Sequence, residues 1–413
     1  MANLIIKPQN TSGDKVIIQD QAGGAVLTTA DSGATITNAT IPTITGNVTA
    51  SGNLTVAGDI VPSVPLSHRN MIINGAMNVA QRATTSSSNR NSGYQCVDRF
   101  RCQETNLGNI AIVQSQYTMS SADLNTTGLS KAFKMDVNTA ESAIGASEKW
   151  SIDYRFEGRD LQHLQYGTAN AQSVTLSFWA KSNVAGVYGI SMLQTDGAKR
   201  IGSTYTLASN VWKKVSITFI GNTADLIVND KTQGLEITWG LLVGGDYTGG
   251  TNTSWGATAN NKYFNGHTAV WGTSTSDDFY LTGVQLELGS NATPFEHRTY
   301  QEDHIKCCRY YQILQGLGGM CAPALQNSST NYAFTLPLVT PLRSSPTLTR
   351  TGNLTMCRHN GYETLTAASN VYWRSDPIQP SVDFAGAGLS QGSDMYGGMM
   401  YCGTTKFELY AEL

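Results

Sequence analysis

Charged residues are scarce in this chain of 413 residues. Lys, Arg, Asp and Glu make up 14% of it, and the formal net charge is −3, whereas an average domain is about 25% charged. No long basic run occurs, and electrostatic capture of nucleic acid depends on clustered Lys and Arg. We therefore predict that the chain does not bind nucleic acid.

Long hydrophobic runs are also absent. No segment approaches the ~18 consecutive apolar residues of a membrane-spanning helix, which predicts no membrane insertion. The opening stretch MANLIIKPQNTSGDK lacks the charged region and apolar core of a secretory signal. The sequence thus predicts a protein made in the cytoplasm without a signal peptide.

The cysteines do not suggest a disulfide framework. There are seven, an odd number at irregular spacings, which fits free thiols kept reduced in a cytoplasm. The adjacent pair Cys307 and Cys308 lacks the C-x2-4-C spacing of zinc ligands. We expect neither a metal nor another cofactor.

The chain is rich in residues that build strands and tight turns. It has 41 glycines and many Asn, Ser and Thr residues, which predicts β-structure with short connections. Between residues 67 and 298 many runs alternate with period two, the pattern of half-buried strands. Two clear sets of core-facing residues are Val174, Leu176, Phe178 and Ala180, and Leu235, Ile237, Trp239 and Leu241. Such strands predict an antiparallel β-sandwich of the jelly-roll type.

The amino-terminal segment carries a six-residue repeat. Each copy begins with glycine and has an apolar residue two positions later, at Val48, Leu54 and Ile60. One copy of this strand cannot bury these side chains alone, whereas identical chains winding around one axis can. We predict a parallel homotrimeric β-shaft; the alternative is a disordered Gly/Thr linker.

The sequence changes pattern twice near residue 300. Phe279–Leu288 alternates like a strand, and Gly289–Pro294 contains residues that end one. The residues predicted to share one face of this strand are Tyr280, Val284, Leu286 and Leu288. Arg298–Gln312 predicts a short, solvated connector helix with Ile305 and Cys308 on one face.

Several stretches resemble a family of bacteriophage tail-fibre proteins in which a carbohydrate-binding-module-like jelly roll precedes a distal β-domain. The matching stretches are RNMIINGAMNVAQR with GYQCVDRF, VTLSFWAKS, GVQLELGSNATPFEHRTY with CCRYYQ, and LPLVTPLRSSPTLT. The departures are the cysteine doublet and residues 351–405. The resemblance implies that residues 69–77 lie near 279–288. It also supports three domains: 1–66 for virion attachment and the shaft, 67–300 for the jelly roll, and 301–413 for a smaller distal β-sandwich.

Two polar, aromatic-rich segments are candidate sites for carbohydrate. Aromatic rings on loops of a rigid scaffold can stack on the C–H face of a sugar, while Asn and Asp bind its hydroxyls. The candidates in residues 244–275 are Asp246, Tyr247, Trp255, Asn261, Tyr263 and Trp271, and those in residues 358–403 are Tyr372 and Trp373. The structural alternative is that these rings cover the end of the sandwich or pack against a neighbouring chain.

No sequence motif indicates catalysis. Nucleotide-binding glycine motifs, nucleophile elbows and HExxH helices are absent. Carboxylate pairs for glycoside hydrolysis can be drawn from Asp246, Asp277, Asp278 or Glu157, and a metal site from Glu296, His297, Glu302, Asp303 and His304. Solvated turns and a solvated helix explain both sets more simply, so we expect no enzyme.

The sequence as a whole predicts a homotrimeric phage tail fibre in the virion. Its amino-terminal part would attach to a tail or other virion protein, and its distal domains would recognise host surface polysaccharide or lipopolysaccharide. The alternatives are a structural virion fibre or adaptor without a ligand, in the head or the tail, and a glycan-cleaving tailspike.

Overall fold

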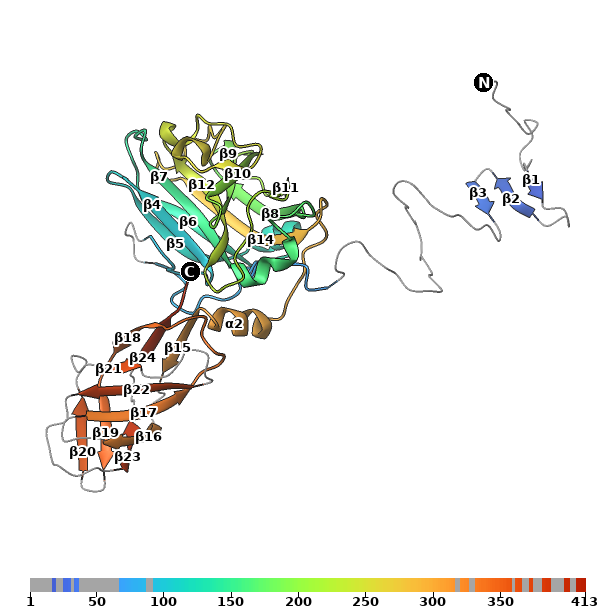
Figure 1. The fold of residues 1–413 in the computed structure, drawn as a ribbon. Helices are drawn as coiled ribbons and strands as arrows, with labels where there is room; N and C mark the ends of the chain where they lie inside the picture. The colour runs from blue at the N-terminus through green and yellow to red at the C-terminus, as the bar shows by residue number, and fades with distance from the viewer. Residues whose placement is uncertain are drawn as a thin grey trace. The chain divides into compact units, whose positions relative to one another are not determined.

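The computed structural model describes residues 17–19, 25–30, 33–36, 67–86, 92–315, 320–326, 331–358, 361–365, 371–373, 381–387, 397–401 and 406–413. The chain divides into two compact units, Met1–Pro62 and Ser63–Leu413. The first contains one antiparallel sheet of β1 (Ile17–Gln19), β2 (Ala25–Ala30) and β3 (Gly33–Ile36) (Figure 1). The predicted trimeric shaft, with its six-residue repeat, lies outside the described residues.

Two antiparallel sheets form a β-sandwich in the second unit (Figure 1). The six-stranded sheet has the order β13 (Gly256–Ala257), β10 (Lys199–Leu207), β9 (Gly186–Gln194), β12 (Gln233–Val243), β7 (Lys149–Glu157) and β4 (Phe100–Thr105). The five-stranded sheet has the order β11 (Lys213–Phe219), β8 (Val174–Ser182), β14 (Asp278–Leu288), β6 (Lys131–Thr139) and β5 (Ala111–Thr118). Helix α1 (Ser121–Thr127) and the 3-10 turns η1 (Gly158–Leu164), η2 (Gly245–Tyr247) and η3 (Asn260–Lys262) lie in the connections. The predicted all-β sandwich is confirmed.

The core lies between the two sheets and contains the predicted sets. All eight side chains that were expected to face the core on β8 and β12 are in one buried cluster. Trp150, Trp239 and Trp271 are its largest fully buried side chains. Period-two alternation therefore placed these two strands correctly, because the inner face of each sheet packs on the other sheet. Polar residues of the outer faces, such as Thr175 and Thr238, are buried as well.

The structure of strand β14 corrects the predicted orientation of Tyr280. Thr282 is opposite Trp179 on β8, whereas Gln285 is opposite Ser177, so β14 has one extra residue there. This bulge contains Gly283, whose φ is +60°, a conformation that glycine adopts without strain. As a result Val284 and Leu286 face the core, but Tyr280 lies in a separate cluster on the other face.

The opening segment runs beside β14, as the resemblance implied. The Met71 amide donates to the Leu286 carbonyl (2.9 Å), and the Val284 amide donates to the Gly75 carbonyl (3.0 Å). The match to an opening strand is nevertheless wrong, because the segment forms turns rather than a regular strand. Gly75 is required there, since a Cβ would lie 2.1 Å from the Val284 carbonyl oxygen.

Helix α2 (Tyr300–Cys308) is the predicted connector, and it begins with a capping box. The Thr299 side chain accepts from the Glu302 amide (3.3 Å), and the Glu302 carboxylate accepts from the Thr299 amide (2.8 Å), which satisfies two amides at the helix start. The helix is not solvated as predicted. Its buried residues include Asp303 and both cysteines, whereas Ile305 is 41% exposed.

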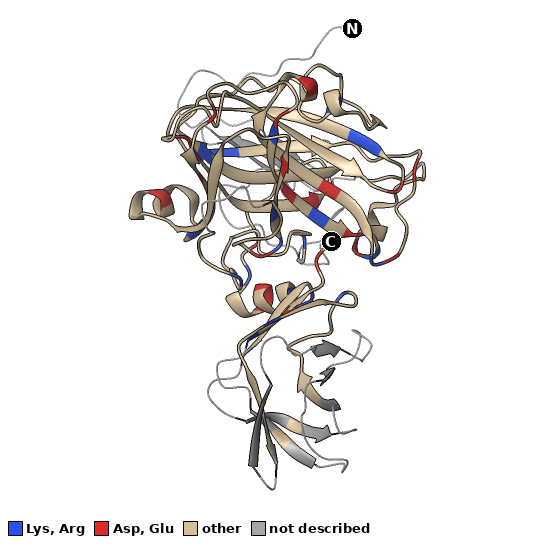
Figure 2. Cartoon of the chain, turned by 90° about the vertical axis from the view of Figure 1, so that its left-hand side faces the viewer, with Lys and Arg blue, Asp and Glu red and all other residues tan. Residues whose placement is uncertain are grey.

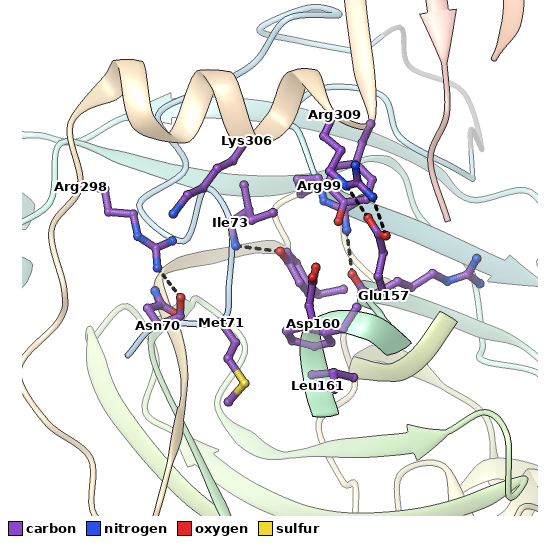
Figure 3. A pocket seen from close by; sticks show the side chains of 14 residues that line it. Asn70, Met71, Ile73, Arg99, Glu157, Asp160, Leu161, Arg298, Lys306 and Arg309 are labelled. Atoms are coloured by element: carbon purple, nitrogen blue, oxygen red, sulfur yellow. Dashed lines mark hydrogen bonds and ion pairs between the residues drawn. The ribbon is translucent and has the colours of Figure 1, made fainter. Parts of the chain in front are cut away.

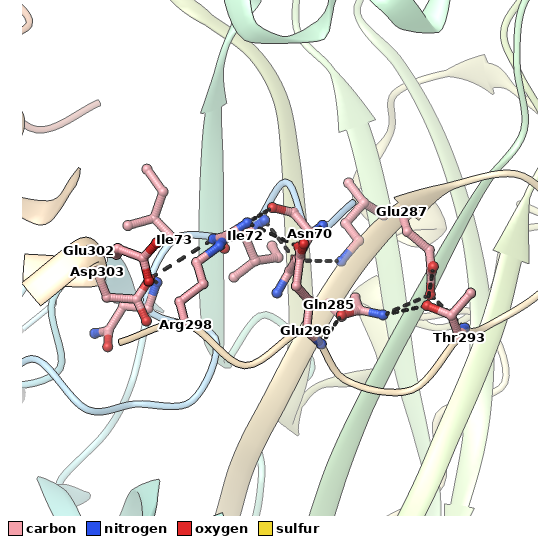
Figure 4. A network of polar contacts seen from close by, with 12 residues as sticks. Asn70, Ile72, Ile73, Gln285, Glu287, Thr293, Glu296, Arg298, Glu302 and Asp303 are labelled. Carbon is pink, nitrogen blue, oxygen red and sulfur yellow. Dashed lines mark hydrogen bonds and ion pairs between the residues drawn. The ribbon is translucent and has the colours of Figure 1, made fainter. Parts of the chain in front are cut away.

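Polar contacts explain why α2 packs on the sandwich with a buried carboxylate. Asp303 accepts from the Asn74 amide (3.2 Å), and Glu296 accepts from the Asn70 amide (2.8 Å) (Figure 4). Arg298 donates to the carbonyls of Ile72 and Asn70. Two of the three carboxylates considered as metal ligands, those of Glu296 and Asp303, therefore bind backbone amides of the opening segment, and Glu302 binds the Thr299 amide.

Residues beyond α2 form two antiparallel sheets. The first has the order β15 (Tyr311–Gln315), β24 (Lys406–Tyr410) and β18 (Thr347–Thr351). The second has the order β20 (Gly361–Leu365), β19 (Leu354–Arg358), β23 (Gly397–Tyr401), β16 (Met320–Gln326), β17 (Asn331–Pro337), β22 (Ser381–Ala387) and β21 (Val371–Trp373). The last strand of the chain, β24, is thus central in its sheet, with Phe407 and Leu409 buried.

Candidate functional site

The sandwich loops place the predicted carbohydrate-binding residues in different environments. Asp246 and Asn261 are exposed on the turns η2 and η3. Tyr247 is buried, with its hydroxyl donating to the Ser147 carbonyl (3.2 Å). Trp271 is fully buried in the core, so its ring has no face open to a ligand and it fills the sandwich as the structural alternative stated.

Residues 244–268 fold over one end of the outer face of the six-stranded sheet. Phe264 is fully buried and packs on the central strands at two glycines. A Cβ at Gly189 would lie 2.5 Å from the Phe264 Cβ, and one at Gly240 would lie 2.8 Å from its ring. The glycines therefore let this loop lie directly on β9 and β12.

Trp255 is half-buried at the edge of this loop. Its indole N–H donates to the Ile220 carbonyl (2.6 Å), and its ring meets Tyr166 edge to face, with centroids 5.9 Å apart. Part of the indole remains accessible. Trp255 is consequently a fixed aromatic surface, as a sugar-stacking residue needs to be.

Tyr263 is the aromatic residue that reaches over the sheet. The guanidinium carbon of Arg200 lies 3.6 Å from the centroid of its ring, and the Lys149 ammonium lies 4.5 Å from it. Arg200 is on β10 and Lys149 is on β7, two strands that are separated by β9 and β12. The half-buried Tyr263 ring thus lies between cations from both sides of the sheet.

Below Tyr263 the outer face of the six-stranded sheet is polar. Because Trp150, Ile152 and Tyr154 of β7 point into the core, the alternate residues of that strand point outward, and the neighbouring strands follow the same rule. The outward-facing residues, which we call the polar face, are Arg101, Gln103, Lys149, Ser151, Asp153, Arg155, Ser191, Arg200, Glu236 and Thr238. Figure 2 shows that acidic and basic positions are interspersed on the strands of the sandwich.

The polar face is held by hydrogen bonds between neighbouring strands. Arg155 donates to Glu236 (2.8 Å) and Arg200 donates to the Ser191 hydroxyl (2.7 Å). The Lys149 ammonium donates to the Gln103 side-chain carbonyl (3.0 Å). These bonds fix the long side chains, so that the face is preorganised.

Three charged groups of the polar face keep unsatisfied atoms. Arg101 Nη1, Asp153 Oδ2 and Arg200 Nη2 are buried without a hydrogen-bond partner among the described residues. The first two are 3.9 Å apart, too far for a hydrogen bond. Buried polar atoms without partners are uncommon, and each implies a bound water or another partner.

Burial sets the protonation of this face. Desolvation, followed by the charge of Glu236, raises the pKa of Asp153 to about 6, although Arg101 opposes the shift. Desolvation also lowers the pKa of Lys149 and of Arg200. The polar face consequently offers both donors and an acceptor, with Asp153 changing its role near pH 6.

The sequence analysis missed the polar face. The alternation in Lys149–Glu157 was the signal that could have found it, because the residues between the apolar positions are mostly charged. Tyr372 and Trp373 belong to strand β21, and their side chains lie outside the described residues. Among the residues that are described, no cluster of three His, Cys, Asp or Glu side chains could hold a metal ion. No described helix is long and apolar enough to cross a membrane.

Comparison with known proteins finds solved structures that are similar to this chain. No family model and no curated protein matches the sequence. Tailspike protein 4 of bacteriophage CBA120, solved as its enzymatically active domain, is similar with a TM-score of 0.27 and 11% identity, over 53% of this chain and 21% of that one. This chain therefore spans about a fifth of the length of that protein.

Two carbohydrate-binding modules are also similar. The family 11 module of the cellulase Lic26A-Cel5E of Clostridium thermocellum has a TM-score of 0.25 and 10% identity, over 51% of this chain and 99% of the module. TmCBM61, solved with β-1,4-galactotriose, has a TM-score of 0.27 and 9% identity, over 53% and 99% of the two chains. At these values the likeness does not extend to a ligand or an activity.

Proposed function

We propose that the sandwich binds a glycan across the polar face and the adjoining ring of Tyr263. The observation that carries this proposal is the preorganised polar face, whose half-buried members Arg101, Gln103 and Arg155 remain partly accessible on the side of the sheet that Tyr263 covers. Sugar hydroxyls donate and accept hydrogen bonds, so a glycan can bond to these guanidinium and amide groups. The half-buried Tyr263 ring beside them supplies the apolar surface for a sugar C–H face.

In the wider proposal the chain is a phage tail fibre that recognises host surface polysaccharide or lipopolysaccharide. It would assemble as a homotrimer, attach to a virion protein through its amino-terminal part, and act without catalysis. The resemblance supports this, because the matching stretches contact one another: Asn70 bonds to Val284, Gln81 to the Tyr311 carbonyl, and VTLSFWAKS pairs with β14. Three sites in one trimer would add avidity of ~10^2- to 10^4-fold.

The test is binding of the full chain to purified host surface polysaccharide, measured by calorimetry. Tyr263→Ala should weaken binding about fivefold or more, since stacked rings contribute about 1 kcal/mol or more. The matched control is Tyr117→Ala, because Tyr117 is a half-buried ring on the five-stranded sheet. Equal effects of the two variants would contradict the proposed face, and release of reducing ends would indicate a tailspike instead.

A further inference from the structure

A second concave site borders the polar face at Arg155, where the opening segment, β7, η1 and α2 meet. It is a pocket of about 300 Å³, at the lower limit of small-molecule sites, which are typically 300–1,000 Å³. Residues on one side come from α2 and its flanks, and those on the other come from β7 and η1 (Figure 3). The volume suits one small molecule, such as a single sugar unit.

Most of the charges that line this pocket are already neutralised. Each of its four arginines is in an ion pair with a carboxylate: Arg309 with Glu157, Arg99 with Glu412, Arg155 with Glu236, and Arg298 with Glu296. The Arg309 pair is bidentate, with N–O distances of 2.8 and 2.9 Å. These groups therefore build the wall and leave little charge for a ligand.

Two lining groups of opposite charge remain. Lys306 and Asp160 have no ion pair or side-chain hydrogen bond within the part of the chain that the structure describes. Figure 3 shows the Lys306 side chain directed from α2 into the pocket, with Asp160 on the opposite wall. Desolvation and then the charge of Arg298 lower the pKa of Lys306, while desolvation and then Glu157 raise that of Asp160. A lowered lysine pKa and a raised aspartate pKa both favour the neutral form, as is typical of buried charges that lack a close partner of opposite charge.

The pocket also has an apolar surface. Met71, Ile73, Phe156 and Leu161 contribute side chains to the lining. The Ile73 amide is not available to a ligand, because it donates to the Tyr154 hydroxyl (2.7 Å). An occupant therefore meets one cation, one carboxylate and a hydrocarbon surface.

We propose that this pocket binds an acidic sugar unit, with its carboxylate on Lys306, its hydroxyls donating to Asp160, and its C–H face on Met71 and Ile73. A single ammonium suits a carboxylate, whereas a phosphate site typically has a bidentate arginine or several amides, and the arginines here are occupied. The pocket shares Arg155 with the polar face, but its other lining residues are different, and its occupant goes beyond the proposed function.

The experiment titrates the full chain with D-glucuronate, D-glucose and inorganic phosphate, followed by saturation-transfer NMR. Glucuronate should bind more tightly than both other probes. Lys306→Met should lower its affinity at least about tenfold, because a hydrogen bond to a charged group contributes about 1.5–3 kcal/mol. Asp160→Asn should lower it less, since the amide still accepts one bond. The control is Lys214→Met, on an exposed position of β11.

Two results would overturn this proposal: glucuronate affinity that is unchanged in Lys306→Met, or phosphate binding as tight as glucuronate binding. Tyr263→Ala separates the two sites. It should weaken polysaccharide binding at the polar face about fivefold or more and leave glucuronate binding intact. If Tyr263→Ala has no effect on polysaccharide while Lys306→Met removes glucuronate, the polar face fails and the pocket stands.

Discussion

Replacing Arg309 tests how α2 is held on the sandwich. The Glu157 carboxylate is fully buried, and its side chain meets two arginines: Arg309 at 2.8 and 2.9 Å and Arg159 at 3.4 Å. Burial raises the pKa of Glu157, but the hydrogen bonds of Arg309 and Tyr310 and the charge of Arg309 outweigh it, so the net shift is downward. The carboxylate is thus ionised and depends on Arg309.

Arg309→Met would leave that carboxylate buried without its bidentate partner. Breaking a buried pair in this way costs about 3–5 kcal/mol. Arg159→Met provides the matched control, because Arg159 is 45% exposed and exposed pairs contribute about 0–1 kcal/mol. The measurement is the free energy of unfolding in denaturant at pH 7, with an unchanged slope as evidence that the same structure unfolds.

The pH dependence of the Arg309→Met deficit has a defined sign. A carboxyl with a lowered pKa stabilises the folded state above its unfolded pKa, 4.5 for Glu157, and this stability is lost as the pH falls through the folded value. The deficit of Arg309→Met should therefore shrink on acidification, because protonation removes the unpaired charge. Equal losses in the two arginine variants, or a deficit that grows in acid, would refute the reasoning.

Three further changes probe the sandwich. Burial raises the pKa of Asp153 from its ordinary 3.8 to about 6 in the folded state, so its protonation stabilises the folded state as pH falls between these values; Asp153→Asn should lack this gain in thermal melts. Asn74→Ala removes three buried hydrogen bonds of 2.9 Å and should lower the free energy of unfolding by at least about 2 kcal/mol. The control variant Asn78→Ala, at a half-buried position, should lower it by less than about 1 kcal/mol. Gly189→Ala would push a Cβ against Phe264, and a loss of about 1–3 kcal/mol in chemical unfolding is expected; no loss would show that the loop does not lie on β9.

Much of the sandwich was predictable because one face of each strand is apolar and packs on the opposite sheet. Val174, Leu176 and Phe178 show this, since their alternation is continuous and their strand is central. Tyr280 was placed on the wrong face, because a single extra residue at Gly283 reverses every side chain beyond it. Nothing in a period-two pattern marks such a bulge except the glycine itself.

The helix and the site were harder to predict for a related reason. Ile305 looked like the buried residue of α2, yet Asp303 is buried instead, because a backbone amide of the distant opening segment binds its carboxylate. Trp271 looked like a loop ring and fills the core. Polar residues of a strand, such as Asp153, appear solvated in a sequence, and only the fold shows which of them share a desolvated face.

The most direct measurement is binding of the full chain to host cells before and after periodate destroys their surface glycans, with Tyr263→Ala and Tyr117→Ala measured in parallel. Our account predicts that binding disappears after periodate treatment, falls about fivefold or more in Tyr263→Ala, and is unchanged in Tyr117→Ala. Binding that survives periodate, or that depends equally on both tyrosines, would contradict glycan recognition at the polar face.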